Sequence, residues 1–199
     1  PGHAQVKSEY TRLGALIAIG VGALNQGGTL NIRDSVILNP FGFGDGLYLK
    51  SDDAGPTSTL IDGGTILGSP GSVGIVAISA SGPSTPGNAQ LRLNNSIVYG
   101  HDFAITHQTL FPADILKIDV DSSAYDSTRV ITDVGAGTAA IDVKGLVELN
   151  GVDPKFLDPG NPDYSLAPGS PLIDVGQAIV VARDGSELIS LYFYRPSRR

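Results

Sequence analysis

Apolar and polar positions follow one pattern in an eight-residue block that recurs along the chain. Clear copies cover residues 32–39, 61–68 and 93–100, which begin 29 and 32 residues apart, and a weaker copy covers 118–125. An apolar-polar alternation leads to the third position of each block, and an apolar run follows it. Alternation with a period of two predicts a β-strand, so each block predicts a strand, a bend of one residue and a second strand.

The bend position holds Asp34, Gly63 or Asn95 in the three clear copies. These residue types adopt a left-handed backbone at the lowest cost. We therefore predict that the chain changes direction at these three residues, with a positive φ.

Another strand-like element recurs between the blocks, at residues 16–19, 47–49, 75–78 and 103–105. A repeat of three short strands without a helix cannot bury its own apolar face. Stacking the repeats at about 4.8 Å joins like positions into one continuous core. The sequence therefore predicts an all-β fold, a right-handed parallel β-helix of four to five rungs with an irregular C-terminal closing segment.

We expect one domain over residues 1–199. A lead-in of residues 1–13 precedes the rungs at 14–150, and a closing segment at 151–176 precedes a terminal strand and basic tail at 177–199. Because the chain begins at Pro1 rather than at Met, we expect it to be a fragment of a longer protein.

The composition agrees with a fold made of strands and excludes some classes of binding partner. The chain has 26 Gly, 13 Pro and no Cys, which favours turns and excludes disulfides and thiolate metal sites. A net charge of −7 argues against nucleic-acid binding, and we interpret Arg195, Arg198 and Arg199 as a solvated tail. The most hydrophobic stretch, residues 13–24, is shorter than the roughly 20 residues of a membrane span, so no span is predicted.

Residues 153–176 carry two motifs, Asp-Pro-Lys-Phe and Leu-Ala-Pro-Gly-Ser-Pro-Leu-Ile-Asp-Val-Gly. They resemble the closing segment of bacterial secreted right-handed β-helix proteins of the pectin-lyase-like superfamily. The resemblance implies an extracellular or cell-surface location. We expect the apolar side chains of this segment to lie along the last rungs and cover the exposed end of the stack. These side chains are Phe156, Tyr164, Leu166, Leu172 and Ile173.

The repeat alignment also predicts an outward column of polar side chains. In one interpretation these are the alternating charges of a solvated sheet. In the other they form a shallow trough for sugar hydroxyls, with Tyr48 or Tyr99 as a stacking platform. The column is Arg33, Asp62, Asn94 and Asp119, flanked by Asn31, Leu60, Arg92 and Lys117, and the candidate ligand-binding residues are Arg33, Asp62, Arg92, Asn94, Lys117 and Asp119.

The superfamily includes polysaccharide lyases and glycoside hydrolases, so the resemblance allows for catalytic and metal-binding groups. Gly100-His101-Asp102 partly resembles the Gly-His-Gly of polygalacturonases, whose other motifs have no counterpart, and we interpret His101 as a structural loop residue. Asp114, Asp119 and Asp121 are possible oxygen ligands for calcium, but no established calcium-binding spacing is present. We predict no catalytic residue, no metal site and no cofactor.

These observations favour a non-catalytic extracellular or cell-surface module that is adhesive or carbohydrate-facing. Its expected partner is a polysaccharide or cell-surface glycan. A polysaccharide lyase or glycoside hydrolase is the first alternative, and a structural or self-assembling spacer is the second. The sequence leaves the oligomeric state open.

Overall fold

The computed structural model describes twelve segments of the chain, and they contain strands, turns and connections but no helix. No helix long and apolar enough to cross a membrane therefore occurs within these segments. The segments are residues 11–14, 21–26, 28–39, 43–51, 55–80, 86–125, 137–144, 147–149, 152–159, 163–173, 180–181 and 187–188.

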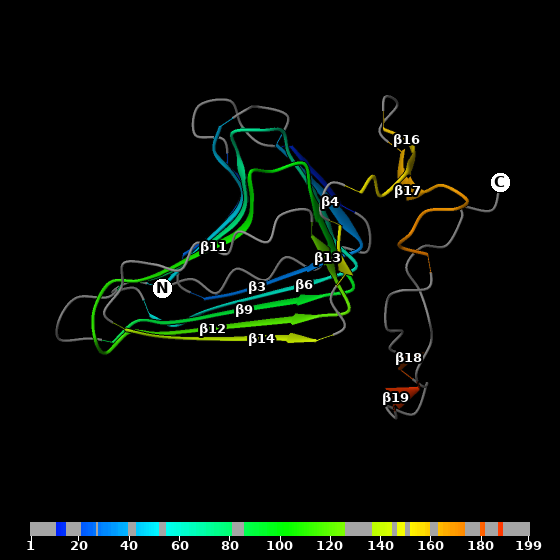
Figure 1. Cartoon of the computed structure of the whole chain (residues 1–199). Helices are drawn as coiled ribbons and strands as arrows, with labels where there is room; N and C mark the ends of the chain where they lie inside the picture. Colours follow the sequence, from blue (N-terminus) through cyan, green and yellow to red (C-terminus); the bar gives the residue numbers. More distant parts are fainter. Residues whose placement is uncertain are drawn as a thin grey trace.

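Three parallel sheets form the sides of a β-solenoid (Figure 1). The six-stranded sheet contains, in order, β1 (Thr11–Gly14), β4 (Ser35–Leu38), β7 (Thr65–Leu67), β10 (Ile97–Tyr99), β13 (Ala124–Tyr125) and β15 (Val147–Glu148). The four-stranded sheet contains β11 (Phe103–Thr109), β8 (Val73–Ser79), β5 (Asp45–Ser51) and β2 (Val21–Gln26). The five-stranded sheet contains β14 (Thr138–Lys144), β12 (Ile115–Asp121), β9 (Asn88–Asn94), β6 (Thr57–Asp62) and β3 (Gly28–Arg33).

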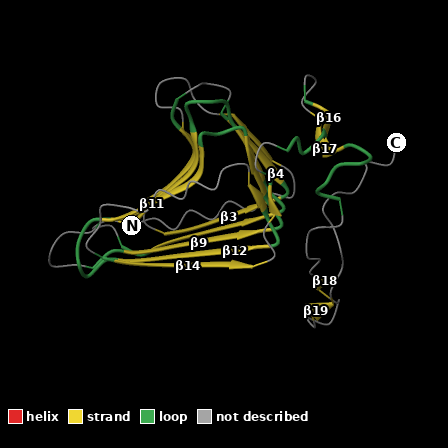
Figure 2. Cartoon of the chain, viewed as in Figure 1, coloured by secondary structure: helices red, strands yellow, loops and turns green. Residues whose placement is uncertain are grey.

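The chain visits the three sheets in a fixed sequence, and Figure 2 shows the strands stacked side by side with loops at the corners. The successive strand sets are β2-β3-β4, β5-β6-β7, β8-β9-β10 and β11-β12-β13, and from the first set to the fourth the chain completes about three turns. The predicted parallel β-helix is confirmed as a parallel β-solenoid. Its rung count differs slightly from the four to five that the sequence predicted.

The predicted alignment of the three clear blocks matches the observed register. Ile32 pairs with Ile61, and Ile61 pairs with Leu93. The bend residues Asp34, Gly63 and Asn95 have φ values of 43°, 66° and 46°. The left-handed bend inferred from residue type alone is therefore confirmed at all three positions.

The register of the fourth block was predicted wrongly. Leu93 pairs with Val120 rather than with Ile118, so the predicted copy was shifted by two residues. The bend of this rung is Ser122, whose φ is 47°. Serine adopts this conformation far less readily than Gly, Asn or Asp, so residue type did not mark the bend.

The second recurring element is confirmed in three of its four copies. Residues 47–49, 75–78 and 103–105 lie within β5, β8 and β11, which pair with one another in parallel. Residues 16–19 lie outside the described part of the chain. The strand that pairs with β5 on its other side is β2, five residues further along than predicted.

The core consists of columns that pass through like positions of the repeat. Burying one Leu or Ile side chain contributes about 1.5–3 kcal/mol, and stacking multiplies that contribution from rung to rung. One column, in the five-stranded sheet, follows the first position of the block: Ile32, Ile61, Leu93 and Val120. Another, in the six-stranded sheet, follows its sixth position: Ile37, Ile66, Val98 and Tyr125.

A ladder of buried serines supports the corner after each bend, at the fourth position of the block. The hydroxyls of Ser35, Ser96 and Ser123 donate to the carbonyl oxygen two residues earlier, over 2.6, 2.6 and 2.8 Å. Ser96 Oγ also accepts from Gly64 N at 3.0 Å, and Ser123 Oγ accepts from Ser96 N at 3.1 Å. Each of these two hydroxyls therefore links neighbouring rungs.

We expect Ser96→Ala to lower the free energy of unfolding by about 1–2 kcal/mol, because a buried backbone N–H loses its acceptor. That N–H belongs to Gly64. Urea denaturation followed by circular dichroism measures the change. Ser69→Ala is the matched control, because the buried Ser69 hydroxyl has no hydrogen-bond partner. Equal losses in the two variants would contradict a role for the ladder.

The closing segment packs on the side of the solenoid. Its strands β16 (Phe156–Asp158) and β17 (Asp163–Leu166) form an antiparallel pair. Leu166 and Leu172 are buried in a second core cluster with side chains from the outward face of the six-stranded sheet, and Phe156 packs against this cluster. The members from that sheet and its C-terminal edge are Ile97, Ala124, Leu149 and, partly buried, Tyr99.

The expected position along the last rungs is thus confirmed for Phe156, Leu166 and Leu172, but they cover a lateral face rather than the end of the stack. Ile173 is exposed. Aromatic contacts extend this packing: Phe156 meets Tyr99 and Tyr164 edge-on, with ring centroids 6.4 and 5.7 Å apart. Further along the chain, β18 (Val180–Val181) and β19 (Glu187–Leu188) form a short antiparallel pair.

Candidate ligand-binding face

The candidate site is the outward face of the five-stranded sheet, which we call the polar face. Strands β6, β9 and β12 alternate between buried and more exposed residues, so every second side chain points away from the core. The strands lie side by side and extend the full width of the solenoid (Figure 1).

Parallel register arranges outward side chains in three rows that each cross all five strands. The first row is Thr29, Ser58, Gln90, Lys117 and Ala140; the second is Asn31, Leu60, Arg92, Asp119 and Asp142; the third is Arg33, Asp62, Asn94, Asp121 and Lys144.

All six residues predicted for the site lie on this face, but two occupy other rows than expected. Arg33, Asp62 and Asn94 share a row, as the alignment predicted. Asp119 lies beside Arg92 instead of Asn94, and Lys117 lies beside Gln90. The two-residue shift of the fourth block explains both corrections. An even shift keeps a side chain on the same face, which is why no residue moved into the core.

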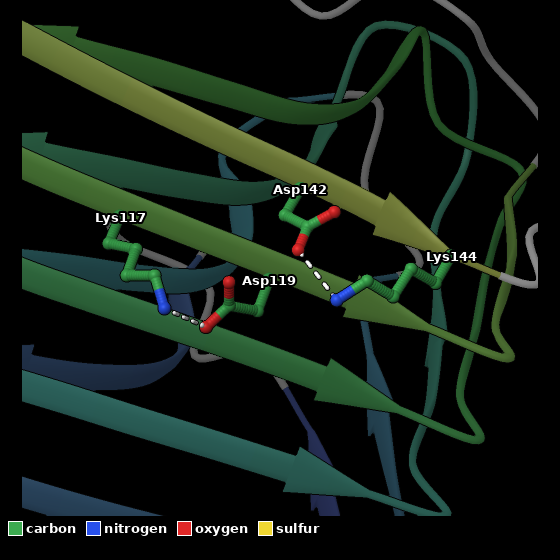
Figure 3. A network of polar contacts seen from close by, with 4 residues as sticks. All are labelled: Lys117, Asp119, Asp142 and Lys144. Atoms are coloured by element: carbon green, nitrogen blue, oxygen red, sulfur yellow. Dashed lines mark ion pairs between the residues drawn. The ribbon is translucent and has the colours of Figure 1, made fainter.

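Two ion pairs connect neighbouring rows within single strands (Figure 3). Lys117 Nζ lies 3.0 Å from Asp119 Oδ2 in β12, and Lys144 Nζ lies 2.7 Å from Asp142 Oδ2 in β14. The hydrogen bond to Asp142, and then its negative charge, raise the pKa of Lys144. Both pairs are solvent-accessible, so they order the side chains rather than stabilise the fold appreciably.

Charge on the three rows is balanced, although the whole chain is acidic. Arg33 and Arg92 make no side-chain hydrogen bond or ion pair with the described residues, so both guanidinium groups have donors available. The face therefore offers cationic hydrogen-bond donors and anionic acceptors to a ligand that lies across the rungs. Its cations are Arg33, Arg92, Lys117 and Lys144, and its carboxylates are Asp62, Asp119, Asp121 and Asp142.

Neither predicted aromatic platform belongs to the polar face. Tyr48 lies in β5, which is part of the four-stranded sheet. Tyr99 lies in the six-stranded sheet and packs against Phe156 of the closing segment. The described outward side chains of the five-stranded sheet include no aromatic ring, so this face offers polar groups but no stacking platform.

His101 is buried beside the neighbouring rung, which agrees with its interpretation as a structural residue. Its Nδ1 lies 2.8 Å from Ser72 Oγ, whose own proton is donated to the Ser69 carbonyl oxygen at 2.6 Å. The histidine Nδ1–H is therefore the donor to Ser72. A Cβ atom at Gly68 would overlap the imidazole ring, so this glycine leaves room for it. Burial lowers the pKa of His101 to about 4.

The three carboxylates considered as calcium ligands each have different hydrogen-bond or ion-pair partners. Asp114 is buried and accepts three backbone hydrogen bonds, from Gly87, Leu110 and Phe111, at 2.8–3.1 Å. Asp119 pairs with Lys117. Asp121 accepts a hydrogen bond from Ser122 Oγ at 2.9 Å. No group of three or more His, Cys, Asp or Glu suited to a metal occurs in the described segments.

Sequence reasoning missed three charged members of the polar face, Asp121, Asp142 and Lys144. Asp121 was missed because the fourth block was misaligned. The other two lie in β14, which was not recognised as a copy, although the sequence continues after Lys144 with Gly145, a residue type expected at the bend. The signal was present, because Ala139, Ile141 and Val143 alternate with polar or small residues across β14.

Comparisons of the chain with known proteins identified no relative. No protein-family model, no curated protein and no solved structure matches the chain.

Proposed function

We propose that this chain is a non-catalytic, extracellular or cell-surface module that binds glycans across the polar face. The observation that carries the proposal is the arrangement of donors and acceptors in three parallel rows, with Arg92 at the centre. A polysaccharide presents hydroxyl groups at regular intervals along an extended chain. Rows that repeat from rung to rung are matched to such a polymer rather than to a small compact ligand.

Charge narrows the expected ligand. The four cations and four carboxylates of the three rows cancel, so the face has no net field that favours a strongly acidic polymer. We therefore expect neutral glycans to bind better than uronate or sulfate polymers. The extracellular location, and membership of the pectin-lyase-like proteins of bacteria, are supported by the resemblance of residues 153–176 to their closing segment.

A glycan array probed with the complete chain tests this proposal. We expect binding to a neutral polysaccharide, and we expect Arg92→Ala to weaken it at least about tenfold, because charge-assisted hydrogen bonds are lost. Gln108→Ala is the matched control, since Gln108 is an outward side chain of β11 in the four-stranded sheet. A signal at background for every glycan, or equal loss in the control, would contradict the proposal.

The alternative, a polysaccharide lyase or glycoside hydrolase, predicts turnover. Incubating the chain with uronate polymers and recording the absorbance of the unsaturated product tests the lyase. We expect no product. If product forms and Lys117→Ala or Arg92→Ala abolishes it, the polar face is an active site and the non-catalytic proposal is wrong.

A further inference from the structure

The C-terminal end of the five-stranded sheet exposes apolar side chains that equivalent positions in earlier rungs bury. Ile141 is 40 % exposed and Val143 is 42 % exposed, whereas their register partners Ile118 and Val120 are 1 % and 2 % exposed. All four side chains point to the core side of the sheet. One more layer of protein is therefore needed to bury the last rung as the others are buried.

An apolar depression opens at this end of the solenoid. Strand β14 also forms the edge of its sheet, since β12 is its one strand neighbour among the described residues. The outer side of β14 thus presents backbone N–H and C=O groups that a further strand can pair with. The depression is lined by Ile105, Ile118, Val120, Tyr125, Ile141 and Val143.

The chain's own closing segment does not supply this layer. Leu166 and Leu172 are committed to the outward face of the six-stranded sheet, in the cluster that contains Ile97 and Ala124. The sequence had predicted that this segment covers the end of the stack. Within the described segments, its lateral position therefore leaves the outer side of β14 uncovered.

We propose that a second copy of the chain covers this end, with the two β14 strands paired antiparallel about a two-fold axis through Ile141. The strand is self-complementary in this register. On the core side, Ile141 faces the partner's Ile141, and Ala139 faces the partner's Val143. On the outer side, Asp142 faces the partner's Ala140, so no like charges lie directly opposite.

Head-to-tail stacking fits the structure less well. It would place β3 of one copy against β14 of the next, but the core-side residues of β3, Leu30 and Ile32, are already buried. Continuing the rows in register would also place Arg33 beside Lys144, which is a like-charge pair. The two-fold pair closes on itself, so the assembly stops at two chains.

Light scattering coupled to size-exclusion chromatography tests the assembly on the complete chain. We expect a mass of twice 20.5 kDa, falling to 20.5 kDa for Ile141→Lys, because the substitution places two cations opposite each other at the axis. Ile115→Lys is the matched control: the same change on the outward face of β12 leaves the dimer intact. A monomeric unmodified chain, a dimer that survives Ile141→Lys, or a series of larger species overturns the proposal.

A cross-link tests the two-fold arrangement with a substitution that does not have to break the dimer. The chain contains no cysteine, so a single introduced thiol has no competitor. Directly opposite Cβ atoms in an antiparallel pair lie about 4.5–5.5 Å apart, close to the spacing that a disulfide needs. Under mild oxidation we expect Ile141→Cys to give a covalent dimer and Ile115→Cys to stay monomeric on a denaturing gel. Absence of the Ile141→Cys cross-link overturns the proposal.

Discussion

Replacing Asp114 by alanine is expected to destabilise the fold by about 3–4 kcal/mol, since hydrogen bonds to a charged acceptor contribute about 1.5–3 kcal/mol each and do not add fully. The buried carboxylate accepts from Leu110 N and Phe111 N within its own turn, and from Gly87 N in the preceding rung. Its loss leaves Gly87 N and Phe111 N without their acceptor, whereas Leu110 N keeps the Ser79 carbonyl oxygen at 3.0 Å. The turn between β11 and β12 then loses its side-chain link to the previous rung and keeps the backbone hydrogen bonds from Leu110 N and Ile115 N.

Chemical denaturation of Asp114→Ala, followed by circular dichroism, measures the loss. Asp142→Ala is the control that also removes one carboxylate, and we expect it to change the stability little because its ion pair is exposed. Asp114→Asn keeps the shape of the side chain but replaces one of its two acceptor oxygens by an NH₂ donor. Its oxygen can serve the two N–H groups of the turn, but its NH₂ group faces Gly87 N–H, so we expect an intermediate loss. Equal stability of Asp114→Ala and Asp142→Ala would refute this role.

Stability is expected to fall by about 3 kcal/mol between pH 6.5 and pH 4 through His101 alone. Burial lowers the folded-state pKa of this histidine from 6.5 to about 4. Between these values the unfolded chain binds the proton and the folded chain does not. Acidification therefore favours the unfolded state through this window, and the contribution of His101 levels off below pH 4.

Carboxylates also titrate at acidic pH. The contribution of His101 is therefore the difference in free energy of unfolding between the unmodified chain and His101→Gln. We expect the free energy of unfolding of the unmodified chain to decline more steeply with acidification than that of His101→Gln. Glutamine keeps a donor for Ser72 Oγ but has no proton to bind in this range. Parallel pH profiles for the two proteins would show that His101 does not titrate as proposed.

The rungs could be predicted where one residue marked the bend. Asp34, Gly63 and Asn95 belong to the few types that favour a positive φ, so aligning them also aligned the strands on both sides. Ser122 takes the same backbone conformation without belonging to that group, and the register of its rung was lost. The polar face survived this error because a two-residue shift preserves the side on which a residue lies.

The closing segment shows what a repeat pattern leaves undecided. Its apolar residues indicated contact with the solenoid, but the pattern does not choose between the end of the stack and a side. A clue was present in Ile97-Val98-Tyr99, where apolar residues occupy both faces of β10. Such a run indicates a strand covered on both sides. Val98 fills the core, while Ile97 and Tyr99 contact the closing segment.

The buried hydrogen bonds were equally beyond sequence reasoning. Ser72 and His101 are 29 residues apart, and their contact exists because the solenoid places successive corners beside each other. The serine ladder was hidden by Gly64, which occupies the serine position of the second clear block. These pairs depend on the path of the loops, which the strand periodicity does not encode.

The lateral position of the closing segment determines which layers of the solenoid must unfold together. Rungs of a solenoid touch only their neighbours, so they can normally detach one at a time from an end. Here the segment bridges Ile97, Ala124 and Leu149, which belong to three successive layers. None of these layers can separate while the segment stays docked. The C-terminal layers and the segment therefore form one cooperative unit, which gives a nearest-neighbour architecture a long-range tie.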